Sequence, residues 1–271
     1  MSERSGPSTI VAAGWTVTQL DLGAIFAPLT WVFPLAGEEE IAWLPSNGLL
    51  CRRDDDVVLV DCGLGPFGEV FDLPIRHVEL AASLASADCS VEKVSTVVLT
   101  HLDADHAGGI VAGDPAGSLR PALPHARVVV LDAAQDVLEG RTAQRSELAE
   151  MIGTTLHRAA VEIGAVGDGT EVIAGLRLHS APGHRAGHAS VELSGDGEPL
   201  VYLADVVHAR EHVARPEWDF LHDSEPEVAL ETRRATIEAL AGSGTIVACS
   251  HVDGFGRIER SGTGAVWVDV E

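Results

Sequence analysis

The chain has 271 residues, of which 46% are hydrophobic and 22% are charged, and this apolar content excludes a disordered chain. Its 18 Lys and Arg residues against 41 Asp and Glu residues give a formal net charge of −23. A field of that sign repels phosphate groups, so we expect neither nucleic acids nor anionic membrane surfaces as partners.

Apolar runs and helical patterns alternate along the first half of the chain. Short apolar runs that end in polar residues or glycine predict buried strands at residues 57–61, 94–100 and 126–131. Asp132 is expected to cap a helix, and residues 146–160 carry apolar side chains at helical spacing. This half of the sequence therefore predicts buried strands together with amphipathic helices.

The second half of the chain begins with strands that follow one another directly. Strand-like runs lie at residues 172–179, 189–193 and 200–204, and a glycine-rich turn separates the last two. A helix is predicted at residues 225–241 and a last buried strand at residues 245–249. Neighbouring strands without helices between them do not fit a plain doubly wound sheet. The pattern favours a layered α/β domain.

The chain lacks several features that would divide it or send it elsewhere. Because no linker rich in Pro, Gly or Ser interrupts it, we expect one domain over residues 1–271, with about ten N-terminal residues disordered. The sequence has no run of about 18 apolar residues and no secretory signal at its start. Its four cysteines include no Cys-x-x-Cys pair, which favours reduced, buried thiols. These features predict a cytoplasmic protein.

The stretch from residue 101 to residue 106 is the most informative part of the sequence. It places His101, Asp103, Asp105 and His106 within six residues, directly after a predicted strand. Imidazole and carboxylate groups suit zinc, iron and manganese. In an extended segment, alternate residues would point to one side, and the glycines that follow would let the backbone pass close to a metal. A polar loop capped by Asp105 is the alternative, but buried charges this close together are costly without a cation.

Three later segments have the same character, because in each an apolar strand is followed by a residue that can bind a metal. These residues are His184, Asp205 and His251. A single histidine after a strand is more often a structural residue than a ligand. Together with the 101–106 stretch, however, the three predict a site with more than one metal at one edge of a layered fold.

This order of residues resembles the metallo-β-lactamase-fold superfamily of metallohydrolases. The resemblance spans roughly residues 47–258 and implies an αββα sandwich with two metals at one edge of the β-layers. It is carried by Asp61, the 101–106 stretch, Pro182-Gly183-His184, Asp205 and Ser250-His251.

The resemblance also implies a role for each of these side chains. Asp61 would orient a ligand imidazole, and His188 would be structural or would support a ligand. Five side chains would each bind one of two metals and Asp205 would bridge them, with His101 and His184 at the first metal and Asp105, His106 and His251 at the second.

One residue departs from the family pattern, in which a second histidine stands where this chain has Asp103. A carboxylate there would make the first site harder and more anionic. Two zinc ions are implied by the resemblance, and the carboxylate shifts the preference toward iron or manganese. If Asp103 points away from the site, the first metal would keep only His101, His184 and the bridging Asp205.

A narrower resemblance follows Asp205 and is similar to the branch that contains N-acyl-homoserine lactone lactonases and methyl parathion hydrolase. It implies a small-molecule lactone, carboxylic ester or phosphotriester as substrate. In the lactonases a tyrosine three residues beyond the bridging Asp contacts the substrate carbonyl, and His208 stands in that place here. The resemblance is carried by Asp205-Val206-Val207-His208, Pro216, Trp218, Asp223, Pro226 and the helix that contains Glu231-Thr232-Arg233-Arg234.

These features predict a metal-dependent hydrolase in which a metal-bridging hydroxide attacks the substrate, with Asp105, Asp205 and His208 as catalytic residues. One alternative is a non-haem iron redox enzyme of the same fold that acts on oxygen, NO or persulfide, since flavodiiron proteins carry a carboxylate at the position of Asp103. Another is a non-catalytic member of the fold. Four aromatic residues are expected either to line an apolar pocket or to form core or a homodimer contact, namely Trp31, Phe33, Trp218 and Phe220.

Overall fold

Two β-sheets pack face to face because each presents apolar side chains to the other. In the computed structural model, which describes residues 7–33, 40–70, 73–114, 117–142 and 147–270, the buried layer between the sheets contains Trp15 and Val58 from the first sheet. It contains Val191 and Tyr202 from the second. Removal of this apolar surface from water holds the two sheets together.

The first sheet has eight strands within the described residues. They run in the order β1-β2-β3-β4-β6-β9-β10, and β5 pairs with β2 away from this path. The strands are β1 (Ser8–Ala12), β2 (Trp15–Pro28), β3 (Ile41–Arg53), β4 (Asp56–Val60), β5 (Ile75–His77), β6 (Thr96–Val98), β9 (Arg127–Leu131) and β10 (Ile163–Val166).

The second sheet has seven strands in the order in which they occur along the chain, and a separate hairpin pairs β7 with β8. The second sheet contains β11 (Glu171–Ile173), β12 (Leu176–Ser180), β13 (Ala189–Leu193), β14 (Leu200–Tyr202), β15 (Ile246–Cys249), β16 (Val252–Ser261) and β17 (Gly264–Val270), and the hairpin contains β7 (Val111–Gly113) and β8 (Leu119–Pro121).

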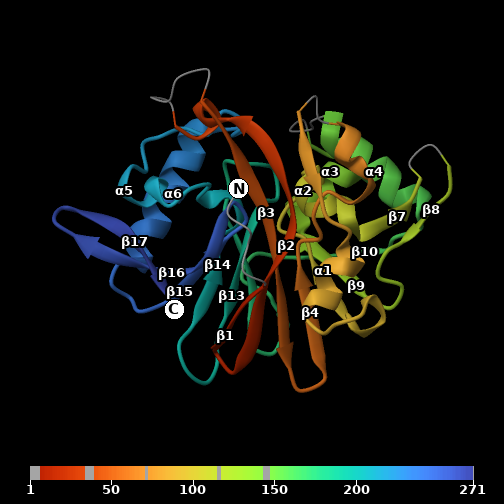
Figure 1. Cartoon of the computed structure of the whole chain (residues 1–271), viewed down its shortest axis with the longest axis horizontal. Helices are drawn as coiled ribbons and strands as arrows, with labels where there is room; N and C mark the ends of the chain where they lie inside the picture. Colours follow the sequence, from red (N-terminus) through yellow and green to blue (C-terminus); the bar gives the residue numbers. More distant parts are fainter. Residues whose placement is uncertain (1–6, 34–39, 71–72, 115–116, 143–146, 271) are drawn as a thin grey trace.

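Helices cover the outer faces of both sheets (Figure 1). Leu84, Val137 and Leu156 pack into one outer core with the first sheet, and Ile237 packs with Ile258 on the second. The expected αββα arrangement is therefore confirmed. The helices are α1 (Leu80–Ser86), α2 (Ala104–Ala107), α3 (Asp132–Leu138), α4 (Glu147–Arg158), α5 (Glu211–Ala214) and α6 (Pro226–Leu240), with short 3-10 turns at Leu29–Trp31, Gly65–Val70, Val91–Lys93, Gly108–Ile110 and Ala204–Val206.

The predicted elements differ from the structure at a few places. The run at 172–179 is a hairpin of β11 and β12, because Gly175 adopts a positive φ and turns the chain. Asp132 is the first residue of α3, and Leu131 occupies the cap position. Of the ten or so N-terminal residues that were expected to be disordered, residues 1–6 lie outside the described residues, and the strand β1 starts at Ser8.

Parallel strand pairs bring distant parts of the sequence to one edge of the sandwich. Strand β4 runs parallel to β6, and β14 runs parallel to β15. Because parallel strands end at the same edge, the residues that follow them meet there. Asp61 follows β4, Asp205 follows β14 and His251 follows β15. No helix among the described residues is both long enough and apolar enough to cross a membrane.

The glycines after His106 serve a structural purpose. A Cβ atom at Gly109 would lie 1.9 Å from the carbonyl oxygen of Cys62, and one at Gly108 would lie 2.2 Å from that of Leu64. These glycines therefore allow the chain to pack against the turn after β4. Their expected role in letting the backbone pass close to a metal stays a prediction.

We expect Gly109→Ala to destabilise the fold by about 1–3 kcal/mol, because the added methyl group must displace the backbone at Cys62. Urea unfolding followed by circular dichroism measures this change. Gly164→Ala is a matched control, since its nearest atom would be the Val128 oxygen at an ordinary 3.6 Å. Equal free energies of unfolding for the two variants would contradict the prediction.

Candidate metal centre

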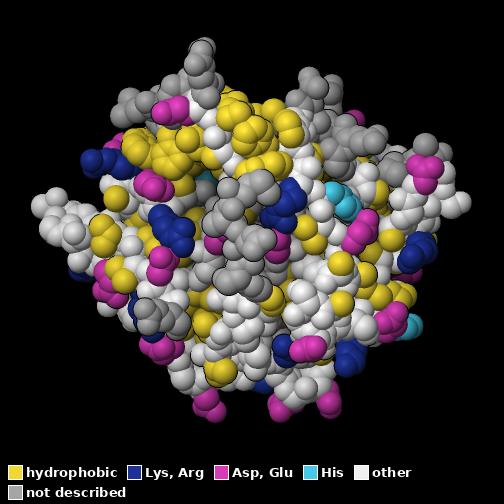
Figure 2. Space-filling view, viewed as in Figure 1, with side chains coloured by type: hydrophobic (Ala, Val, Ile, Leu, Met, Phe, Trp, Pro, Cys, Tyr) yellow, Lys and Arg dark blue, Asp and Glu magenta, His cyan; other side chains and the backbone are white. Residues whose placement is uncertain are grey.

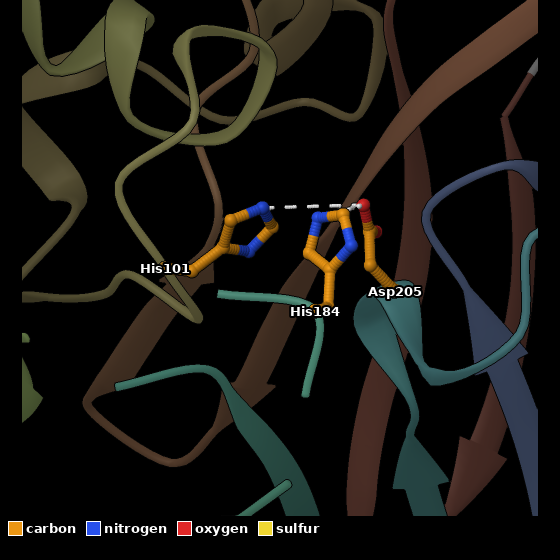
Figure 3. Close-up of side chains that lie close together, drawn as sticks. All are labelled: His101, His184 and Asp205. Atoms are coloured by element: carbon orange, nitrogen blue, oxygen red, sulfur yellow. Dashed lines mark ion pairs between the residues drawn. The ribbon is translucent and has the colours of Figure 1, made fainter. Parts of the chain in front are cut away.

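The candidate ligands reach the edge of the sandwich from both sheets. His101 comes from the segment after β6 in the first sheet, whereas His184 and Asp205 follow β12 and β14 in the second. Figure 3 shows the three side chains approaching one another from these opposite sides. The site therefore exists only when the two sheets are packed together.

The 101–106 stretch does not stay extended. Asp103 has extended backbone angles, and the short helix α2 begins at Ala104. The expected alternation of residues 101, 103 and 105 was therefore wrong beyond Asp103. A helical turn separates successive side chains by about 100° rather than 180°, and for this reason the adjacent Asp105 and His106 both face the site.

The first group of donor atoms is formed by His101, His184 and Asp205, all of which are buried. The Oδ2 atom of Asp205 lies 3.9 Å from Nε2 of His101 and 3.3 Å from Nε2 of His184. Ligands bound tetrahedrally at about 2.1 Å from one ion lie about 3.4 Å apart. The spacing of this group thus fits a single cation.

A second group lies on the other side of Asp205 and consists of Asp105, His106 and His251. Asp105 Oδ2 lies 3.6 Å from His106 Nε2 and 3.9 Å from His251 Nε2. Asp205 faces this group too, with Oδ1 at 3.4 Å from His106 Nε2 and Oδ2 at 3.3 Å from His251 Nε2. Asp205 is therefore placed between two groups of donors, as a bridging ligand must be.

Each of four histidines is fixed through its Nδ1 atom, so that its Nε2 atom points into the site. The Nδ1 atom of His101 lies 3.1 Å from Thr100 Oγ1, that of His106 lies 2.8 Å from Asp61, that of His184 lies 2.9 Å from Asp223, and that of His251 lies 2.7 Å from the Pro45 oxygen.

The Nε2 atoms of His101, His106 and His184 are buried and have no hydrogen-bond partner. A buried imidazole nitrogen without a partner is costly, and coordination of a cation satisfies it. Support of the opposite ring nitrogen is the usual environment of metal-binding histidines. The residues present therefore fit two divalent cations.

Asp61 occupies the place that the sequence analysis gave it. It is fully buried and accepts hydrogen bonds from the backbone N–H and the hydroxyl group of Thr100. Its other contact, at 2.8 Å, is with Nδ1 of His106. Asp61, which follows β4 of the first sheet, thus holds the His106 ring with Nε2 turned toward the site.

His188 is buried beside the site and has both ring nitrogens occupied. Its Nδ1 donates to the oxygen of Ala181 at 2.8 Å, and its Nε2 accepts from the backbone N–H of Asp205 at 3.1 Å. Burial lowers its pKa to about 4, so the ring is neutral at pH 7. His188 therefore holds the backbone of Asp205 in place.

His208 is buried within the same site, but neither of its ring nitrogens has a hydrogen-bond partner. Its ring stacks on Phe220 with a centroid distance of 3.7 Å, and its Nε2 lies 3.5 Å from Asp205 Oδ2. Burial lowers the pKa of His208 well below its usual value, with His184 and His251 adding to this effect. A neutral imidazole with an unpartnered N–H therefore faces the two groups of candidate ligand atoms.

The buried carboxylates determine which histidines of the site carry protons. Burial opposes ionisation of Asp205, but the neighbouring His106 and His251 lower its pKa well below the usual range. Burial likewise opposes a charged His184, but Asp103 and Asp223 raise its pKa to about 9. Without a cation, therefore, protons on His106, His184 and His251, whose pKa values the neighbouring carboxylates raise, offset the charge of the buried carboxylates.

Sequence reasoning gave no role to the two arginines that support the site, although Arg233 lies in the helix that carries the narrower resemblance. Arg185 binds Asp103 through two nitrogens, and the buried Arg233 donates to Asp223 Oδ2 at 3.1 Å and to the Val206 oxygen at 2.9 Å. Arg233 therefore orients Asp223, which in turn holds His184. Arg185 follows a predicted ligand directly in the sequence, but its partner lies 82 residues away and only the fold brings them together.

The four aromatic residues that were expected to line a pocket, or to form core or a homodimer contact, make several ring contacts. Phe33 packs edge-on against Trp218, with a centroid distance of 5.2 Å, whereas Phe220 contacts His208. Trp31 lies beyond them, 4.5 Å from the ring of His222. Residues 31–33 contact the 208–224 loop, where the Leu221 N–H donates to the Trp31 oxygen at 3.0 Å and the ring of Phe33 packs on Trp218.

Comparisons with known proteins agree with this geometry. Residues 41–251 match the family model of the metallo-beta-lactamase superfamily. A search of curated proteins gave no match.

Several solved structures share the fold. AidC, described as a dizinc quorum-quenching lactonase in complex with an N-hexanoyl-L-homoserine product, superposes with a TM-score of 0.83 at 20% identity over 98% of both chains. The hydrolase AbOPH of the beta lactamase superfamily superposes with a TM-score of 0.83 at 22% identity, over 100% of this chain and 99% of its own. An AiiA variant from B. thuringiensis, with N-decanoyl-L-homoserine bound at its active site, superposes with a TM-score of 0.69 at 18% identity. The match covers 89% of this chain and 94% of the AiiA chain.

Zinc binding to the metal-free protein is expected to release protons at pH 7. His184 carries a proton there because its pKa is raised to about 9, whereas zinc binds the neutral ring. The apparent affinity should therefore rise with pH up to about 9. Isothermal titration calorimetry in phosphate and Tris buffers, which differ in ionisation enthalpy, counts the protons released.

Asp223→Asn is the matched variant for this measurement, because it removes one group that raises the pKa of His184. We expect it to release fewer protons per zinc ion than the unchanged protein does. A binding enthalpy that is the same in both buffers would show that the histidines are already neutral and would contradict the prediction.

Proposed function

The chain belongs to the metallo-beta-lactamase superfamily, and from this membership we propose that it is a metal-dependent hydrolase that cleaves a small-molecule lactone, carboxylic ester or phosphotriester. The observation that carries the proposal is the pair of donor groups that share Asp205, with three buried Nε2 atoms left without a partner. Zinc is the metal we expect at both positions, and iron or manganese is the alternative because of Asp103.

The proposal assigns His101, His184 and Asp103 to the first cation, Asp105, His106 and His251 to the second, and Asp205 to both. When bound, the two cations would supply a water molecule acidified to about neutral pH and an electrophilic contact for the substrate's oxygen. Everything else in the reaction would depend on this chain's own side chains.

Asp205 is the residue best placed to handle the proton of the attacking water. Its carboxylate is ionised, since His106 and His251 depress its pKa. Ser250 donates a hydrogen bond of 2.5 Å to Oδ1, which leaves Oδ2 facing the centre of the site. We propose that Oδ2 accepts the proton of the water and passes it to the oxygen that leaves, as a general base and then a general acid.

His208 is proposed to bind the substrate's carbonyl or phosphoryl oxygen. Its ring is neutral and buried, and its stacking on Phe220 fixes the plane in which an N–H donates. A preformed donor in a dry site stabilises the negative charge that develops on that oxygen. Its two unpartnered nitrogens support this role, because most buried polar groups in folded proteins have a hydrogen-bond partner.

Apolar side chains near the site favour a substrate with an acyl or aryl part. Leu221 is 64% exposed, and its backbone N–H donates to the Trp31 oxygen at 3.0 Å, next to the Phe220 that covers His208. Figure 2 shows apolar side chains gathered at the upper ends of β2 and β3, where Trp43 pairs with Phe26. AidC and AiiA, which carry homoserine derivatives in their structures, have the same fold and support this choice of substrate class. A homodimer contact at this surface and a cytoplasmic location stay predictions.

We expect Asp205→Asn to lower kcat/KM at least about hundredfold, because the amide cannot accept the proton of the attacking water. Hydrolysis of lactones, aryl esters and phosphotriesters, each with zinc, manganese or iron supplied, provides the assay, and circular dichroism confirms folding. His106→Ala should lose activity as well. Unchanged rates in both folded variants would refute the assignment, and oxygen uptake without hydrolysis would favour the iron redox alternative.

His208→Phe is expected to keep the stacking on Phe220 while removing both ring nitrogens. We expect kcat to fall by a factor of about 10²–10³, which is the usual effect of losing one hydrogen-bond donor to a developing oxyanion. The amount of metal bound should not change. Steady-state kinetics and metal analysis of the purified variant measure the two quantities. A variant with full activity would show that His208 does not contact the reacting group.

A further inference from the structure

Asp103 faces the first group of donors as closely as Asp205 does. Its Oδ2 atom lies 3.8 Å from Nε2 of His101 and 3.7 Å from Nε2 of His184. The corresponding distances from Asp205 Oδ2 are 3.9 and 3.3 Å. The carboxylate therefore does not point away, and it stands where a further ligand of the first cation would stand.

Arg185 holds this carboxylate through a two-point contact. Its Nε donates to Asp103 Oδ1 at 2.9 Å, and its Nη2 donates to Oδ2 at 2.8 Å. Each carboxylate oxygen has two lone pairs, so Oδ2 still has one to direct at the histidines. The planar guanidinium fork fixes the plane of the carboxylate, which a lysine ammonium group does not do.

The same guanidinium group joins three segments of the site. Its Nη1 donates to the backbone oxygen of His184 at 3.0 Å, to the backbone oxygen of His222 and to Ser224 Oγ at 3.3 Å. Arg185 thus connects the 101–106 stretch, its own segment and the 222–224 loop. Its side chain is 20% exposed, and its contacts with Asp103 and with the His184 oxygen are partly buried.

The charges around the first group explain why this arrangement is stable. Two buried carboxylates, Asp103 and Asp205, flank the same histidines and repel each other. A histidine in place of Asp103 would bring no charge. The positive charge of Arg185 offsets the negative charge of Asp103, so the pair contributes the same net charge as one neutral imidazole.

We propose that Arg185 is a positioning residue for the first metal: it orients Asp103 as a ligand and offsets its charge, so that the two residues together replace one histidine. This inference rests on the proposed metal-dependent function for the presence of a metal at the site. It explains how a carboxylate can stand among the ligands without making the site more anionic.

The test compares Arg185→Met, Asp103→His and the double variant. Titration of the metal-free proteins with Co²⁺, followed by visible absorption and competition with a chelator, reports the affinity and ligand field of each equivalent. Arg185→Met should lower the affinity for one of the two Co²⁺ ions about 10–100-fold, the usual effect of losing a residue that orients a ligand. Asp103→His alone should also weaken it, because the charge of Arg185 is then left uncompensated.

The double variant Asp103→His with Arg185→Met is the decisive measurement. It should bind both Co²⁺ ions with affinities within about threefold of those of the unchanged protein, since a neutral imidazole needs no arginine to offset its charge. Arg185→Lys keeps the charge but loses the fork, and we expect an intermediate affinity. Arg257→Met, which breaks an ion pair with Glu198 outside the site, is the matched control and should bind normally.

Two results would overturn the inference. One is an Arg185→Met variant that binds both Co²⁺ ions with unchanged affinity. The other is a double variant, shown to be folded by circular dichroism, that binds Co²⁺ no more tightly than Arg185→Met does, which would make Arg185 only a link between loops. Failure of the proposed function looks different. A protein that binds two Co²⁺ ions with the expected pattern but hydrolyses no lactone, ester or phosphotriester would refute that function and leave this inference intact.

Discussion

The buried carboxylate of Asp205 is the constraint on which the rest of the site depends. A buried charge is tolerated only when opposite charge or strong donors surround it. Here the Oδ2 atom has four imidazole Nε2 atoms within 3.3–3.9 Å, and protons or cations held among them compensate its charge. These four imidazoles belong to His101, His184, His208 and His251.

The architecture supplies this environment by ending parallel strands at one edge. Strands β4 and β6 belong to the first sheet and β14 and β15 to the second, and the apolar layer between the sheets brings the two edges together. The Nδ1 atom of each candidate ligand imidazole is then held by a partner such as Asp61 or Asp223. The stability of the core and the geometry of the site are for this reason linked, since separation of the sheets would separate the ligands.

The site differs from a simple arrangement of histidines in ways that change its chemistry. Asp103 adds a carboxylate, and Arg185 binds it at 2.8–2.9 Å. His208 adds a neutral imidazole that faces the same carboxylate as the ligands do. Fold alone does not determine which substrate such a site accepts.

Much of this was predictable from the sequence, because short apolar runs predict buried strands and because the ligand residues directly follow them. The pattern of the residues predicted a layered α/β domain with ligand-type residues at one edge, and the resemblance carried by Asp61, the 101–106 stretch, His184, Asp205 and His251 implied the αββα fold. The sequence could not reveal the helical turn at α2 or the pairing of Arg185 with Asp103. Both depend on contacts between segments far apart in the chain, and local patterns of side chains carry no information about such contacts.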